Sequence, residues 1–109
     1  MAYRVTWSRL DKADIQAELA GLRADGHDEE IARVMAFMCA LAEAGHRARE
    51  QNIHTHIAGQ TLHSASPFGT VGVYYAYQTP PTSLIYILGF FLDVYLYFPT
   101  AAARLSNVP

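Results

Sequence analysis

Apolar residues recur with helical spacing between residues 11 and 47, and with the spacing of β-strands from about residue 57 onward. A chain that contains both patterns in separate segments is typical of an α+β domain. The 109 residues are enough for one compact domain and too few for two, so we expect a single domain over residues 1–109.

The first 45 residues predict a short strand and two helices. Residues 2–8 alternate in polarity and place Tyr3, Val5 and Trp7 on one face of a strand. A first helix opens near Asp11, and acidic residues 28–30 suit the positive end of a second helix dipole. The two helices carry apolar stripes that predict a helical hairpin: Ile15, Leu19 and Leu22 in the first, and Ile31, Val34, Met35, Met38, Leu41 and Ala42 in the second.

The second half predicts three strands and a last helix. The strands are expected at residues 59–64, 70–77 and 84–91. The third is apolar on both faces, so we expect it to be central and covered. Pro99 predicts the start of a short helix that continues to Leu105, because proline is tolerated in a first turn. The predicted order is β-α-α-β-β-β-α, with helices packed against a mostly antiparallel sheet.

Charged side chains are almost confined to the first half of the chain. Residues 1–50 hold seven of the eight Lys and Arg and nine of the ten Asp and Glu, which leaves Asp93 and Arg104 in the second half. The formal net charge of −2 gives no global field toward nucleic acid or anionic lipid. A function in the second half must therefore use aromatic rings, histidines, hydroxyls, the backbone or a partner.

The sequence predicts a cytoplasmic protein without a membrane segment. No apolar region of a signal peptide is evident near the N-terminus. The longest apolar stretch, residues 84–98, is interrupted by Asp93 and is shorter than the about 20 residues that a membrane helix needs. The single cysteine, Cys39, cannot form an intrachain disulfide, and its apolar neighbours predict a buried side chain.

The order of the predicted elements and several local segments resemble the RelE/ParE superfamily of toxins from type II toxin–antitoxin modules, and its HigB-like branch in particular. The segments that carry the resemblance are the strand and helical hairpin at the start, Gly69 with residues 71–76, residues 85–90, and the Ala- and Arg-containing residues 101–105. The resemblance covers most of the chain. It implies a RelE/ParE-like fold, a cognate antitoxin as partner, and either ribosome-bound mRNA or DNA gyrase as target.

Four positions depart from that branch. Its two sheet arginines correspond to Ser66 and Gly72, its histidine corresponds to Leu88, and Asp93 stands where lysines are usual. Cleavage of a phosphodiester needs cations near the developing charge and a group that moves a proton. The sequence therefore supports the scaffold of the superfamily better than its endoribonuclease activity.

If the chain still cleaves mRNA, the candidate catalytic residues are His63, Tyr77, Tyr97 and Arg104. His54 and His56 would share one face of a strand and could bind a metal together with His63. Their spacing matches no zinc signature, so solvated loop histidines are the favoured interpretation, and we predict no metal and no cofactor.

The second half is rich in tyrosine but poor in the cations that usually accompany base-stacking sites. Alternate tyrosines on a strand are more typical of a half-buried core. Residues 90–98 instead suit a protein interface, with Phe91, Tyr95 and Phe98 as partner-binding residues and a homodimer as one outcome. Three hypotheses remain open: a toxin with its antitoxin, a non-enzymatic protein-binding module on the same scaffold encoded by a phage or mobile element, and an unrelated α+β interaction module.

Overall fold

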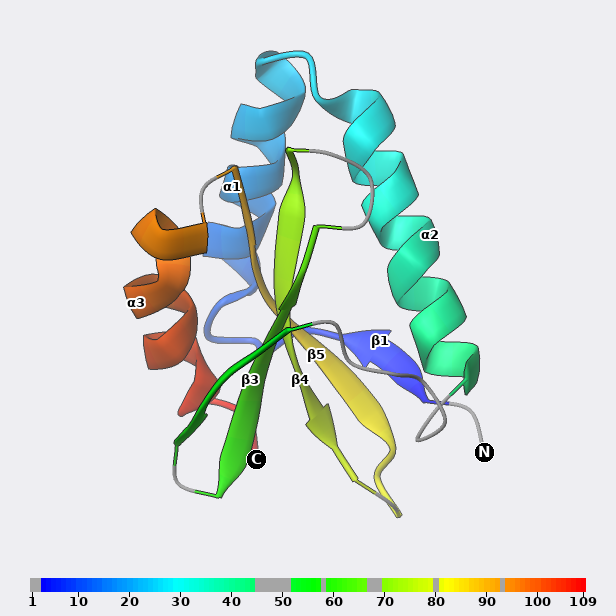
Figure 1. Ribbon diagram of the computed structural model, residues 1–109, viewed down its shortest axis with the longest axis vertical. Helices are drawn as coiled ribbons and strands as arrows, with labels where there is room; N and C mark the ends of the chain where they lie inside the picture. The colour runs from blue at the N-terminus through cyan, green and yellow to red at the C-terminus, as the bar shows by residue number, and fades with distance from the viewer. Residues whose placement is uncertain (1–2, 45–51, 58, 67–69, 80, 93) are drawn as a thin grey trace.

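The computed structural model describes residues 3–44, 52–57, 59–66, 70–79, 81–92 and 94–109, and of residues 52–57 and 94–97 it describes the backbone. The fold is α+β, with three helices and one open sheet in the order β1-β5-β4-β3-β2 (Figure 1). β1 is parallel to β5, and the other neighbouring strands are antiparallel. The elements are β1 (Arg4–Thr6), α1 (Lys12–Ala24), α2 (Asp28–Ala44), β2 (Asn52–Ile57), β3 (Gln60–Ala65), β4 (Gly72–Gln78), β5 (Leu84–Phe91) and α3 (Val94–Leu105).

The coarse α+β prediction is confirmed, and two details of the predicted order are wrong. β2 is an additional edge strand that pairs with β3 through a turn at Gly59, where φ is +81°. Glycine adopts this left-handed conformation without a steric penalty. α3 begins at Val94, so Pro99 lies inside the helix and not in its first turn. A proline in a helix interior removes one backbone hydrogen bond, which is why Pro99 suggested a helix start.

Each face of the sheet has its own apolar core. The predicted stripes of α1 and α2 pack on one face, together with Tyr3, Tyr75 and Phe90. α3 packs on the other face, where Ala101 and Leu105 contact side chains of β3, β4 and β5. We call these the hairpin-side core and the α3-side core. β5 contributes to both, so the prediction that this strand is central and covered is confirmed.

The tyrosines of β4 are core residues. Tyr74 belongs to the α3-side core and Tyr75 to the hairpin-side core, because successive side chains of a strand point to opposite faces. Both are almost fully buried. These two rings are therefore not available for stacking with bases, as the lack of nearby cations in the sequence had suggested.

Cys39 is exposed, so the prediction that it is buried is wrong. The buried residues of α2 recur at intervals of three and four, at Ile31, Val34, Met38 and Leu41. Cys39 directly follows Met38 and is therefore turned by about 100° away from the buried stripe.

An ion pair between Arg104 and Glu18 binds backbone groups of β5 that have no strand partner on that side. β1 pairs with β5 only as far as Tyr86. Beyond that point the Leu88 carbonyl accepts a hydrogen bond from Arg104 Nη1 (2.9 Å), and the Phe90 N–H donates to Glu18 Oε1 (3.2 Å). Arg104 Nη2 and Glu18 Oε2 lie 2.6 Å apart. The pair thus supplies the hydrogen bonds that a longer β1 would have provided.

Gly89 allows this ion pair to approach the strand. A Cβ at this position would lie 3.0 Å from Arg104 Nη1 and 3.2 Å from Glu18 Oε1. The β4–β5 register also shifts here, between Tyr74 and Tyr75. The bulge and the glycine together turn two backbone groups of β5 toward α1 and α3.

Glu30 connects α2 to the loop that precedes β4. Its Oε2 accepts hydrogen bonds from the Thr70 hydroxyl (2.7 Å), the Thr70 N–H (3.1 Å) and the Val71 N–H (3.2 Å). Its Oε1 lies 3.1 Å from His27 Nδ1. The hydrogen bonds from Thr70, His27 and Val71 lower the pKa of Glu30 from 4.5 to about 2.

Because the folded pKa lies below the unfolded value, Glu30 stabilises the fold above about pH 4.5, and this stabilisation is lost as the pH falls toward 2. We expect Glu30→Gln to lower the urea midpoint of unfolding near neutral pH, and the difference from the wild type to shrink in acid. The matched control is Glu29→Gln, because Glu29 is exposed and pairs only with Arg33 of its own helix among the described residues. Equal pH profiles for wild type and Glu30→Gln would contradict this prediction.

Within the described residues, no helix has the length and apolar character that crossing a bilayer requires.

Candidate functional site

The ladder between β3 and β4 is shorter than either strand. Among the described residues it consists of three pairs: His63 with Tyr75, Ser64 with Tyr74, and Ala65 with Val73. Continued in the same register, it would place Thr61 opposite Tyr77 and Gln60 opposite Gln78. At that level β3 still pairs with β2, and β4 still pairs with β5. β3 stays paired with β2 and β4 stays paired with β5, so β3 and β4 diverge from each other (Figure 1).

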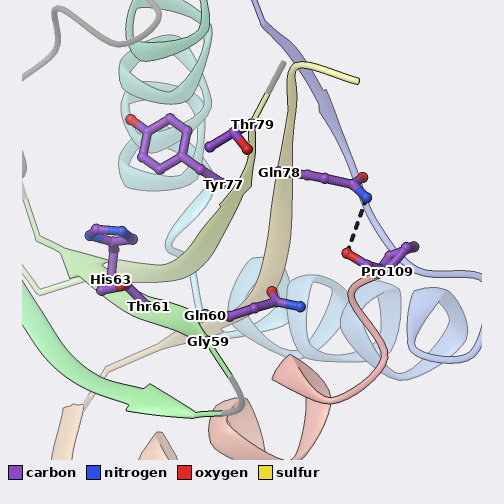
Figure 2. Close-up of a pocket in the computed structure, with 8 residues that line it drawn as sticks. All are labelled: Gly59, Gln60, Thr61, His63, Tyr77, Gln78, Thr79 and Pro109. Carbon is purple, nitrogen blue, oxygen red and sulfur yellow. Dashed lines mark hydrogen bonds between the residues drawn. The ribbon is translucent and has the colours of Figure 1, made fainter. Parts of the chain in front are cut away.

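A cleft of about 290 Å³ lies where the ladder stops, and we call it the β3–β4 cleft. In Figure 2, the rings of His63 and Tyr77 lie on one side of the strands and the carboxamides of Gln60 and Gln78 on the other. The described residues that line the cleft are Gly59, Gln60, Thr61, His63, Tyr77, Gln78, Thr79 and Pro109.

His63 and Tyr77, two of the predicted catalytic residues, come together in this cleft. The His63 ring stacks on Tyr75 with a centroid distance of 5.3 Å and meets Tyr77 edge to face at 5.5 Å. Tyr77 in turn meets Tyr3 edge to face at 5.4 Å. His63 is only 6% exposed. The aromatic contacts therefore hold its ring in one orientation at the edge of the hairpin-side core.

Gln60 and Gln78 hold the end of the chain across the cleft. Gln60 Nε2 donates to the Val108 carbonyl (2.8 Å), and Gln78 Nε2 donates to the Pro109 carbonyl (3.0 Å) (Figure 2). The carboxamide oxygens of both glutamines are buried and, within the described residues, accept no hydrogen bond. Sequence reasoning missed both residues, because nothing in the local pattern marks them. Only the register of β3 against β4 places them opposite each other.

The other predicted catalytic residues do not join this cleft in the described structure. Arg104 is buried at the β5 edge, where its guanidinium is engaged by Glu18 and by the Leu88 carbonyl. The side chain of Tyr97 lies outside the described residues, as do those of His54 and His56. No Lys, Arg, Asp or Glu is among the described residues that line the cleft.

Phe91, one of the predicted partner-binding residues, is buried. Its ring is 3% exposed and packs on Tyr74, with a centroid distance of 4.6 Å. Phe98 is half-buried against the same α3-side core. The side chain of Tyr95 lies outside the described residues. The homodimer expected from this segment stays a prediction.

The geometry defines an α+β protein with an uncharged polar cleft between two strands of its sheet. No family model, curated protein or solved structure matches the chain. The described lining contains aromatic rings and carboxamides, and it contains no Lys or Arg that could stabilise the charge of a phosphoryl transition state.

Proposed function

We propose that this protein is the toxin-like component of a type II toxin–antitoxin module, on a RelE/ParE-like scaffold, and that it acts by binding its target without cleaving RNA. The order of the elements supports the scaffold, because a strand and a helical hairpin precede an antiparallel meander and a last helix, as the resemblance implied. β2 is the one additional element among those described.

The absence of cleavage rests on one observation: His63, Tyr77 and Arg104, the candidate catalytic residues whose side chains are described, do not come together. His63 and Tyr77 line the cleft, whereas Arg104 is committed to Glu18 at another edge of the sheet. Among the described residues no Lys or Arg lines the cleft, so a proton-transfer group there lacks the electrostatic stabilisation that is usually the largest contribution to such catalysis. Binding needs no such assembly.

Induction of the full chain in bacteria is expected to stop growth while ribosome-bound mRNA stays intact. Growth curves and primer extension on a reporter mRNA measure the two results, and the soluble fraction confirms folded protein. Arrest accompanied by mRNA cleavage would contradict the binding mechanism. Growth at the full rate with soluble, folded protein would contradict the toxin-like role.

A second candidate function, a non-enzymatic protein-binding module, is favoured by an apolar hollow beside β1. The hollow has a volume of about 290 Å³ and is lined by Val5, Thr6, Trp7, Met35 and Ile87. Leu10, which follows β1, is 76% exposed. Exposed apolar surface of this kind is common at protein interfaces. Normal growth together with one stably bound protein partner would select this function over the first.

A further inference from the structure

We propose that the outer edge of β1 binds an extended, acidic segment of a partner protein, in which apolar residues alternate with Asp or Glu, as an additional strand of the sheet. The inference deepens the second candidate function and rests on it, because it names the chemistry of the partner segment that the hollow beside β1 accepts.

The outer edge of β1 has backbone groups that no described strand uses. β1 is the outermost strand of the sheet (Figure 1). The Arg4 N–H donates to the Ser83 carbonyl (3.1 Å), so Arg4 and Thr6 turn their backbone groups toward β5. Val5, which lies between them, therefore turns its N–H and C=O to the opposite side. No backbone hydrogen bond among the described residues reaches these two groups, and an unpaired edge is a template for another strand.

The C-terminal end of α2 limits how the edge can be used. The Tyr3 N–H, which faces the same side as that of Val5, already donates to the Ala42 carbonyl in the last turn of α2 (2.7 Å). A second copy paired antiparallel about Val5 would bring Trp7 of that copy against the part of the edge that α2 covers. A short segment of another protein, paired from Val5 onward, avoids this conflict.

The hollow beside β1 selects apolar side chains on one face of the added strand. Val5 and Trp7 lie on the hairpin-side face, and they line the hollow together with Met35 of α2. Among the described residues, no Asp, Glu, Lys or Arg lines it. Every second residue of an added strand lies on this same face. Apolar residues at those positions extend the apolar surface of the hollow.

The charges next to β1 select acidic residues at the positions in between. Arg4 lies on the face opposite Val5 and is exposed. Arg9, in the turn that follows β1, is exposed as well. The ion pairs among the described residues include neither of them. Opposite charges on neighbouring strands stabilise their pairing and like charges destabilise it, so an acidic side chain fits beside Arg4 and a basic one does not.

The single tryptophan of the chain reports binding, because Trp7 lines the hollow. The probe is a capped peptide of alternating Glu and Val, titrated into the full chain at low salt while the Trp7 emission is recorded. We expect a saturable change in emission. A peptide of the same composition, with its Glu and Val in two separate blocks, should bind about tenfold more weakly, because it cannot place Val on one face and Glu on the other.

Two variants separate the charge from the backbone edge. Arg4→Glu should weaken the Glu–Val peptide about fivefold and favour a Lys–Val peptide instead. Val5→Pro removes the outward N–H at an edge position, where proline is tolerated, and should weaken both peptides. The control is Arg23→Glu, because Arg23 lies in the last turn of α1, and this end of the helix lies away from β1 (Figure 1). It should bind like the wild type.

Three results would overturn the proposal. One is an unchanged Trp7 emission when the folded wild type is titrated with the Glu–Val peptide. Another is equal affinity for the Glu–Val and Lys–Val peptides. The third is a dimeric chain that Val5→Pro converts into a monomer, which would assign the edge to a second copy. Isolation of a stable complex tests the protein-binding function separately, so a bound protein that leaves the Trp7 emission unchanged removes this site and leaves that function standing.

Discussion

Replacing Arg104 with alanine is expected to lower the free energy of unfolding by about 3 kcal/mol. Arg104 and Glu18 are 10% and 20% exposed in their side chains, so the substitution leaves a largely buried carboxylate without its cation. It also removes the donor to the Leu88 carbonyl at the edge of β5. Urea denaturation followed by circular dichroism measures the loss.

The control is Arg23→Ala, because Arg23 forms an exposed ion pair with Asp28 at 3.8 Å. Such pairs contribute about 0–1 kcal/mol, so this variant should unfold nearly like the wild type. The double variant Glu18→Ala/Arg104→Ala should lose less than the sum of the two single variants, since both act through one contact. A loss below about 1 kcal/mol in Arg104→Ala would contradict the structural role of this pair.

Arg104 was also a candidate catalytic residue. Measuring the stability of Arg104→Ala alongside its growth arrest distinguishes a structural role from a catalytic one. A loss of growth arrest in Arg104→Ala that follows the unfolded fraction indicates a structural residue. A loss of arrest in a fully folded variant would instead return Arg104 to the functional site.

Replacing Gly72 with alanine is expected to destabilise the fold by about 2 kcal/mol. Gly72 lies directly opposite Phe91 in the β4–β5 ladder. A Cβ at Gly72 would overlap the Phe91 ring and come within 2.5 Å of Ser66 Oγ. The Phe91 ring is 3% exposed and packs on Tyr74, so it cannot move without disturbing the α3-side core. Thermal unfolding of the variant tests this.

The matched control is Gly21→Ala in α1, where a Cβ would meet nothing within 4 Å. Alanine is favoured over glycine in an exposed helix by about 1 kcal/mol, so this variant should gain stability while Gly72→Ala loses it. Changes of the same sign in both variants would contradict the packing account.

Gly72 leaves no space for the arginine that the resemblance implies at this position. The resemblance to the HigB-like branch places an arginine at this position, and here the Phe91 ring takes the space that its side chain would need. An arginine introduced at Gly72 should therefore disrupt the fold.

Most of the secondary structure could be predicted because it depends on local spacing. The stripe of α2 from Ile31 to Leu41 was found from its periodicity, and the covered strand at residues 84–91 from its continuous apolar run. β2 was missed although Ile53, Thr55 and Ile57 alternate with polar residues, because its histidines were interpreted as loop residues. The start of α3 was missed because Pro99 is a stronger local signal than the residues before it.

The candidate site could be predicted only in part. His63 and Tyr77 were selected for their chemistry, but Gln60 and Gln78 carry no local signal and meet only through the register of two strands. Arg104 was selected because it is the sole cation of the second half, and its partner Glu18 lies far away in the sequence.

The sequence by itself determined where most of the helices and strands form and most of the faces that they bury, because these properties depend on side chains within a few residues of one another. Only the tertiary structure decided which polar groups meet. The divergence of β3 from β4, the chain end held by Gln60 and Gln78, and the ion pair on β5 all join residues distant in the sequence. Their positions follow from the packing of whole elements, which no local pattern encodes.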